Sequence, residues 1–490
     1  MEIQVGGSSL PGFILWPLAT VSLALAGLLL TILYNVTLHP LTKYPGPKLW
    51  AATRIPYALM ITILDLHRRY DADVVRVSPN ELSYQHPDAW KDIVGHRTAP
   101  LQENDKDVDF VNEGRIDIIS GRRDDHARYR RILSHGFSTR SMLEQQPIIR
   151  GYVDLFMERL RGQATAGGPV DMVRWYNYTT FDIIGDLTFG ESFGCLETSD
   201  YHPWVRIVFE SIKMASLFNV ARGFPVLAPL LKLFVPKDLV ENGKSHKALV
   251  REKVDKRMDL GMMRPDFAEA MLRRGAEPLT REEMYENADM LILAGSETTA
   301  TALSGATYLL TTNPDVLVRL RDEVRSSFAS EDEIDLLSTA KLGYLHAVIE
   351  EVLRMYPPAP AALPRRTPPG GQVILGQWVP ANTTVAIGHW ALYHNEKFFS
   401  RPFGFHPERW LGDPAFAADR LDAVLPFQTG PRACIGKNLA FAEMRLMLAR
   451  VVWAFDLRLD DQSRGWMDEQ SCYTVWSKPS LMVHLTPRQE

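Results

Sequence analysis

An apolar stretch near the N-terminus sets the first constraint on this chain. Residues 13–34 (FILWPLATVSLALAGLLLTILY) are almost wholly apolar, and no charged residue occurs between Glu2 and His39. A bilayer core of about 30 Å is crossed by roughly 20 residues of helix. A secretory signal peptide has a shorter apolar stretch, a basic start and a cleavage site of small residues. A buried core helix is the alternative, but no charged residue breaks either face. We therefore expect residues 13–34 to be a single transmembrane anchor.

The charges around this segment predict its orientation. Lys43, Lys48 and Arg54 follow it, whereas only Glu2 precedes it. Basic residues flanking a membrane helix favour the cytosolic side. We therefore expect a lumenal N-terminus over residues 1–12 and a cytosolic body.

The rest of the chain has the sequence of one large soluble unit. Pro40, Pro45 and Pro47 lie within residues 35–50, which predicts a stiff, extended hinge. Residues 51–490 contain no internal repeat or flexible linker and are expected to form one catalytic domain. The formal net charge of -5 excludes a strongly basic surface for nucleic acid. Three cysteines without a CxxC pair argue against a disulfide framework or a structural zinc site.

Helical periodicity dominates this body. Thr280 and Glu283 have the spacing of a capping box that opens a helix running to about Thr312, where Asn313-Pro314 ends it. Two more helices are predicted, over residues 339–355 and from just after Cys434. Strand-like segments are short and are centred near residues 74, 373, 383 and 481. The predicted fold class is mainly α with a minor β-sheet.

One of the three cysteines stands in an unusual context, FQTGPRACIGKNLA. Cys434 precedes a predicted helix, whose amide groups favour a thiolate that could be a nucleophile or a metal ligand. A nucleophile needs a nearby base, and no neighbouring residue is a histidine. Phe427 offers an apolar plate, Gly430 and Gly436 allow close backbone approach, and Arg432 supplies a cation. A large planar anionic cofactor, with sulfur bound to iron, would need these groups. Cys195 and Cys472 lack such a context and are expected to be packing residues.

The pattern F-x-x-G-x-R-x-C-x-G resembles the haem-binding loop of the cytochromes P450 at all five positions. The resemblance extends from the proline hinge to the C-terminal strands. WYNYTTFDIIGDLTFGESFG and HPERWLGDP resemble the membrane-anchored members of this family in filamentous-fungal secondary metabolism. The resemblance implies the cytochrome P450 fold, heme b with Cys434 as the axial thiolate, and a place in the endoplasmic reticulum membrane.

Two segments resemble the structural network of the same family. Glu351 and Arg354 form an E-x-x-R pattern, whose i, i+3 spacing places both side chains on one helical face. Such pairs alone are usually solvated ion pairs. Arg409, in FHPERW, matches the residue that completes a Glu-Arg-Arg network in the family. The resemblance implies that this network holds the cysteine loop.

The segment AGSETT, residues 294–299, resembles the oxygen-binding part of a long family helix. Small Ala294 and Gly295 would leave room for a ligand. Thr298 can donate its hydroxyl to the carbonyl of Ala294, and Glu297 beside it would make a proton-delivery pair. A close helix–helix contact would explain the small residues but not the acid.

The resemblance also indicates partners for the haem propionates. His126 and Arg130 stand at i, i+4 in DDHARYRR, and Arg365 matches a family arginine. The sequence leaves open whether Arg365 or its neighbour Arg366 binds a propionate.

The implied activity is a monooxygenase that inserts one oxygen atom from O₂ into a lipophilic secondary metabolite, a terpenoid or a polyketide. The chain has no flavin or nicotinamide motif, so NADPH–cytochrome P450 reductase, with cytochrome b5 as a further candidate, would supply electrons. Epoxidation, desaturation and radical coupling remain variants. An isomerase or dehydratase and a non-catalytic haem sensor also remain open, although Glu297 and Thr298 argue against both. The segments expected to face the substrate are 108–119, 209–224, 290–294, 359–363 and 473–475.

Overall fold

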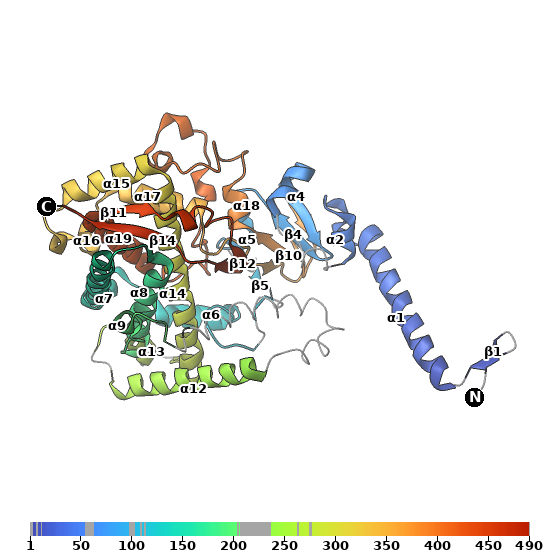
Figure 1. The fold of residues 1–490 in the computed structure, drawn as a ribbon. Coiled ribbons are helices and arrows are strands. Elements are labelled where there is room, and N and C mark those ends of the chain that lie inside the picture. Colours follow the sequence, from blue (N-terminus) through green and yellow to red (C-terminus); the bar gives the residue numbers. More distant parts are fainter. Residues whose placement is uncertain are drawn as a thin grey trace.

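The computed structural model describes residues 3–5, 8–10, 12–53, 63–97, 103–107, 110–111, 114–202, 205, 237–261, 264–273 and 277–489. Helices dominate the described residues; one group of strands lies on the side toward the N-terminal helix, and another lies among the helices near the C-terminus (Figure 1). The expected fold class, mainly α with a minor β-sheet, is therefore confirmed. The substrate-facing segment expected at 209–224 and part of the one at 108–119 lie outside the described residues.

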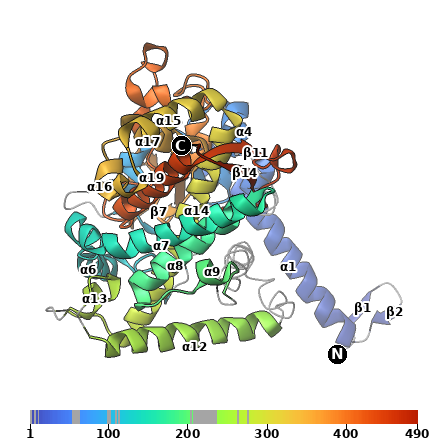
Figure 2. The same ribbon diagram turned by 60° about the vertical axis from the view of Figure 1, so that its left-hand side comes forward.

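The N-terminal helix α1 (Gly12–Thr37) projects away from the body in both views, preceded by a hairpin of β1 (Ile3–Val5) and β2 (Ser8–Leu10) (Figures 1 and 2). Most of its described side chains are exposed, with Leu23 at 75%, while Asn35 near its end is buried. Among the described residues, one helical segment, Ala19–Thr37, is long and apolar enough to cross a membrane. A buried core helix would not leave this surface uncovered, so the exposure is consistent with an anchor.

The extended hinge expected over residues 35–50 is partly folded and docked on the body. Helix α1 continues to Thr37, and Pro40 opens the 3-10 helix η1 (Pro40–Lys43), for which its fixed φ is suited. Leu41 and Tyr44 are buried in a cluster with residues of the nearby sheet. The prolines therefore direct a packed turn, because apolar side chains between them are drawn into the core.

A long helix, α14 (Arg281–Thr312), runs through the helical body (Figure 1). It packs along α8 (Met172–Phe189) and also contacts α12 (Lys237–Asp259), α17 (Gly343–Met355) and α19 (Lys437–Ala454). The predicted capping box is present, since Thr280 accepts from the Glu283 amide and Glu283 accepts from the Thr280 amide. The predicted start and end of this helix are confirmed.

The other helices complete the body. The helix predicted over 339–355 begins later, at Gly343, because Asp335 caps a separate short helix α16 (Leu336–Thr339) and a turn follows. The remaining helices that bear on the site are α5 (Ala89–Val94), α6 (Arg123–Leu133), α7 (Thr139–Ala166), α13 (Phe267–Leu272) and α15 (Pro314–Ser327).

The largest sheet has the order β3-β4-β10-β7-β5. Its strands are β3 (Val74–Ser78), β4 (Glu81–Tyr84), β5 (Asp105–Lys106), β7 (Arg365–Arg366) and β10 (Thr384–Ile387), and only β4 and β10 pair in parallel. A second sheet joins β11 (Phe455–Leu459), β14 (Met482–Pro487) and β6 (Val170–Asp171). Two hairpins are separate, β8–β9 (Gln372–Ile374 and Gln377–Val379) and β12–β13 (Ser471–Tyr473 and Val475–Ser477). The segments near 74, 373, 383 and 481 are thus strands as predicted.

Candidate active site

The cysteine loop precedes α19, as expected. The Cys434 amide donates to the carbonyl of Phe427 at 2.8 Å, which closes the loop. The Cys434 side chain is exposed, whereas Cys195 is buried. Cys472 is also exposed, so the prediction that it is a packing residue is wrong, because its strand β12 lies in a separate two-stranded hairpin.

The two glycines of this loop serve different purposes. Gly430 has φ +79, and a Cβ there would overlap the carbonyl oxygen of Val94 in α5. Only glycine meets both conditions. Gly436 has φ -84 at the N-cap of α19, and a Cβ there would lie 3.9 Å from the Cys434 sulfur. Of the two, Gly430 is therefore required by the loop's backbone, while a Cβ at Gly436 would make only ordinary contact beside the thiol.

The surroundings of the thiol do not by themselves favour the thiolate, contrary to the expectation from helix position. Although the side chain is reachable by solvent, the protein packed around it raises the pKa of Cys434. The Gly436 amide, the Arg130 charge and the Lys437 amide act in the opposite direction. A bound metal ion would reverse this balance, because a coordinating thiol loses its proton.

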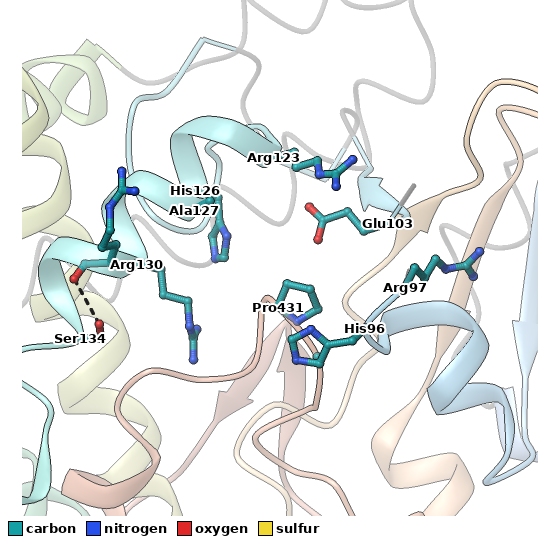
Figure 3. Close-up of a pocket in the computed structure, with 11 residues that line it drawn as sticks. His96, Arg97, Glu103, Arg123, His126, Ala127, Arg130, Ser134 and Pro431 are labelled. Atoms are coloured by element: carbon teal, nitrogen blue, oxygen red, sulfur yellow. Dashed lines mark hydrogen bonds between the residues drawn. The ribbon is translucent and has the colours of Figure 1, made fainter. Parts of the chain in front are cut away.

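Helix α6 brings His126 and Arg130 beside the cysteine loop. Both point from the helix toward the loop that carries Pro431, and they line a cavity of about 620 Å³ (Figure 3). Arg130 donates to the carbonyl of Ala433. Burial, then the charges of Arg432 and Arg130, lower the pKa of His126 to about 3. His126 is therefore neutral at physiological pH.

Strands β5 and β7 add two more cations to this place. Lys106 is the partner of Arg365 in the antiparallel register, and both side chains are buried, Arg365 to 1% exposure. Burial, then the charges of Arg365 and Arg432, lower the pKa of Lys106 well below its usual value. Burial and the Arg432 charge lower the pKa of Arg365 to about 10. Like charges directly opposite each other destabilise a sheet, so this arrangement needs an anion.

The sequence left open which arginine of the pair 365 and 366 faces the site. Arg365 donates to Gln428 at 3.0 Å, and its Nη1 is buried without a hydrogen-bond partner. Arg366 instead forms an ion pair with Asp107 at 2.9 Å. Arg365 thus keeps a buried donor, Nη1, near Lys106 and Arg432, whereas Arg366 is directed to Asp107.

Arg432 lies in the same cluster of basic side chains but is already engaged. It donates to the carbonyl of Gly121 at 2.8 Å and pairs with Glu103 at 3.3 Å and Asp105 at 3.0 Å. We define the basic cluster as Lys106, Arg130, Arg365 and Arg432 together with the neutral His126. The sequence analysis did not predict a role for Lys106, because no local pattern indicates that its strand partner, Arg365, lies 259 positions away.

These residues fit a haem. Its two carboxylates would neutralise the buried positive charge and accept a hydrogen bond from the free Nη1 of Arg365. Without such an anion, these buried groups lack a partner. The accessible thiol of Cys434 stands next to this cluster, since Arg130 acts on both. An iron ligand and carboxylate partners therefore occur side by side.

The predicted Glu-Arg-Arg residues come together in the core. Glu351 and Arg354 are paired at 2.8 Å, and Arg409 reaches Glu351 at 3.3 Å, all three fully buried. Arg354 also donates to the carbonyls of Pro402 and Gly404, and Arg409 pairs with Asp419. Since Trp410 adds a hydrogen bond to Glu351 at 2.9 Å, the network ties α17 to the segment that leads into the cysteine loop.

One strip of α14 is open within an otherwise buried helix. Ala294 is exposed and Thr298 is half-buried, whereas Ser296, Glu297 and Thr299 are buried. The Thr298 hydroxyl donates to the carbonyl of Ala294 at 2.7 Å, as predicted. This strip can therefore contact a ligand.

Gly295 does not contribute to that open strip, so the prediction that it leaves room for a ligand is wrong. A Cβ at Gly295 would lie 2.6 Å from the terminal methyl of Ile184 in α8. The missing side chain lets α8 and α14 approach each other, which is the helix–helix alternative.

Glu297 is directed into the protein. Its carboxylate pairs with Lys478, which follows β13, and the two side chains are 5% and 3% exposed. The sequence predicted a pair with the neighbouring Thr298 and did not indicate Lys478.

A second buried acid lies behind the same helix. Glu443 of α19 is 2% exposed and interacts by hydrogen bond with Thr299, and its Oε2 is without a partner. Burial raises the pKa of Glu443 to about 8. This carboxyl is therefore largely protonated at neutral pH and joins α19 to α14.

Comparisons with known proteins agree with this geometry. The sequence model of the family "Cytochrome P450" matches residues 65–485. Trichothecene C-15 hydroxylase of Fusarium sporotrichioides is 47% identical over 97% of this chain and 99% of that protein. Cytochrome P450 monooxygenase astJ of Aspergillus oryzae is 43% identical over 93% of this chain and 94% of that protein. Averantin hydroxylase of Dothistroma septosporum is 43% identical over 96% of this chain and 92% of that protein.

Proposed function

This chain belongs to the cytochrome P450 family and is a monooxygenase of that family, and we propose that it hydroxylates a lipophilic fungal secondary metabolite, a terpenoid or a polyketide, with electrons from NADPH–cytochrome P450 reductase. The balanced reaction takes substrate, O₂, two electrons and two protons to the hydroxylated product and water. NADPH supplies the electron pair, which the reductase delivers singly. The relatives named as hydroxylases of a trichothecene and of averantin support this reaction type.

The observation that carries the proposal is the surplus of buried positive charge beside an accessible thiol. Cys434 would bind the haem iron, while Arg365, Lys106 and Arg130 would bind the propionates together with Arg432 and the neutral His126. Phe427, packed 5.4 Å from Phe441, would support the loop. When bound, the haem supplies an iron whose thiolate ligand favours cleavage of the O–O bond.

The residues of α14 would leave room for the ligand and deliver protons to it. Ala294 leaves room over the open strip, and Thr298 can hold water through the hydroxyl that it now donates to the Ala294 carbonyl. Glu297 would exchange protons with that water. The Glu351 network would keep the cysteine loop in place, since breaking a buried ion pair leaves an uncompensated charge.

The anchor and location belong to the same proposal. Helix α1 would cross the endoplasmic reticulum membrane once over residues 13–34, with residues 1–12 in the lumen and the catalytic body, 51–490, in the cytosol. The exposed apolar surface of α1 supports this arrangement. A membrane-bound reductase, and cytochrome b5 as an additional donor, would then meet the body on one membrane face.

Reconstitution in microsomes tests the proposal. The wild-type protein, with reductase and NADPH, is incubated with extracts of a host strain from which its gene has been deleted, under ¹⁸O₂. We expect one labelled oxygen atom in the product and no product without NADPH. NADPH-independent turnover would identify an isomerase or dehydratase, while haem binding without turnover on any accumulated metabolite would favour a sensor.

A further inference from the structure

A buried ion pair joins the proton-delivery helix to the C-terminal hairpin. Glu297 of α14 and Lys478 are paired, although 181 positions separate them. Both side chains are almost completely buried, at 5% and 3% exposure. Taking two charges out of water carries a desolvation penalty that can exceed their mutual attraction, so stability alone is a weak reason for such a pair.

A third side chain completes the arrangement. The Lys478 ammonium donates to the Thr301 hydroxyl at 2.7 Å, and that hydroxyl donates to Glu297 Oε1 at 3.4 Å. One carboxylate oxygen is thereby fixed by two donors. The other, Oε2, is buried and has no hydrogen-bond partner. Glu297 is thus fixed through Oε1, while Oε2 stays buried without a protein partner.

The chain just before Lys478 is fixed by the contacts of Trp476. Lys478 follows β13, where Trp476 stacks on Tyr356 at 5.3 Å between ring centroids and donates to the Pro357 carbonyl at 2.9 Å. The tip of the hairpin, residues 473–475, is one of the segments expected to face the substrate. The base of the hairpin is therefore anchored, and its tip is connected through a few residues to the acid.

We propose that Lys478 is a positioning residue for proton delivery, which fixes Glu297 through Oε1, leaves Oε2 to exchange a proton with water near Thr298, and thereby links the substrate-facing hairpin to this step. The inference rests on the proposed monooxygenase function. Without Lys478, the acid would have no fixed orientation, and oxygen reduced with NADPH would leave as hydrogen peroxide instead of entering the product. That side reaction balances as O₂, NADPH and a proton giving hydrogen peroxide and NADP⁺.

A double-mutant cycle tests this. Glu297→Gln, Lys478→Met and the double variant are compared with wild type for product formed and hydrogen peroxide released per NADPH. We expect each single variant to lower product per NADPH several-fold. The double variant should be no worse than Glu297→Gln, because Lys478 acts through the acid. Lys478→Arg should retain most of the coupling, and Arg464→Met, an exposed ion-pair residue in the same C-terminal region, should leave it unchanged.

Stability provides an independent readout. Lys478→Met leaves a buried carboxylate unpaired, whereas the double variant removes both charges, so urea unfolding should show the double variant more stable than Lys478→Met. If Lys478→Met lowers coupling equally in the wild-type and Glu297→Gln backgrounds, or leaves it unchanged, the inference is wrong while the proposed function stands. If wild type itself forms no oxygenated product, the proposed function fails instead.

Discussion

Lys106 lies directly opposite Arg365 on strands β5 and β7, so two buried cations face each other across one pair of strands. Burial, then the Arg365 charge, lowers the pKa of Lys106, while burial, then the Arg432 charge, lowers the pKa of Arg365. An arrangement of this kind is unfavourable unless an anion lies between the charges.

The first prediction concerns this pair. Lys106→Met and Arg365→Met should each lower the affinity for haem, by roughly 10-fold or more if one charge-assisted hydrogen bond of about 1.5–3 kcal/mol is lost. The unfolding free energy of the haem-free protein should stay level or rise, since repulsion is relieved. The measurement is the haem-to-protein ratio together with haem titration of the apoprotein. Arg366→Lys, which keeps a charge next to Asp107, is the control and should retain haem.

The Glu351 network gives the second prediction. Glu351→Gln leaves the fully buried Arg354 and Arg409 without their shared carboxylate, which costs about 3–5 kcal/mol. Thermal unfolding and haem content should both fall. Glu144→Gln removes one partner of an exposed pair with Arg140 and should change stability by less than about 1 kcal/mol. Equal effects of the two substitutions would show that the buried network has no special role.

Gly430 carries the third prediction. Gly430→Ala requires a positive φ and a Cβ that overlaps the Val94 carbonyl, so the cysteine loop must move. We expect marked loss of haem and a lower unfolding temperature. Gly343→Ala, at a helix start with open space around the Cβ position, should be neutral or slightly stabilising. A haem-replete, stable Gly430→Ala protein would contradict this account of the loop.

The fourth prediction separates cofactor binding from proton delivery. Thr298→Ala removes the hydroxyl on the open strip of α14 and should lower product per NADPH while leaving the carbon monoxide spectrum intact. Thr311→Ala removes the same type of hydroxyl bond, to the Thr307 carbonyl, further along the helix and should have no effect on coupling. Tightly coupled turnover in Thr298→Ala would remove Thr298 from the proton path.

The fifth prediction is a pH dependence from Glu443. Burial raises its pKa from the usual 4.5 to about 8. Below pH 4.5 the carboxyl is protonated in both states; between 4.5 and 8 only the unfolded chain releases its proton, which favours unfolding. This contribution to stability therefore falls as the pH rises and levels off above about 8, by a few kcal/mol in all.

Glu443→Gln keeps a hydrogen-bonding group for Thr299 but cannot ionise. The free energy of unfolding of the variant minus that of wild type, measured in urea at the same pH, should be larger at pH 8.5 than at pH 5. A stability difference that does not change with pH would show that Glu443 does not hold its proton in the folded state.

The sequence predicted those features that depend on neighbouring residues. The capping box of Thr280, the bond from Thr298 to Ala294 and the turn around Cys434 all involve residues within a few positions, where local geometry decides the contact. The pairing of Arg409 with Glu351 could be predicted only through the family resemblance.

The features that were missed join distant parts of the chain. Lys478 meets Glu297 only because the C-terminal hairpin folds back on α14, and Lys106 meets Arg365 only through sheet register. Gly295 was assigned to the ligand because a small residue can serve a cofactor or a helix contact, and Ile184 of α8 shows which applies. The proline segment was expected to be extended because its buried Leu41 and Tyr44 carry no local signal of docking.

The most direct measurement is the carbon monoxide difference spectrum of the reduced protein in microsomes, for wild type and for Cys434→Ala expressed with ample haem supply. The account predicts a thiolate-type band for wild type and its complete loss in Cys434→Ala. Survival of that band in Cys434→Ala, or its absence from haem-loaded wild type, would contradict the assignment of Cys434 as the ligand.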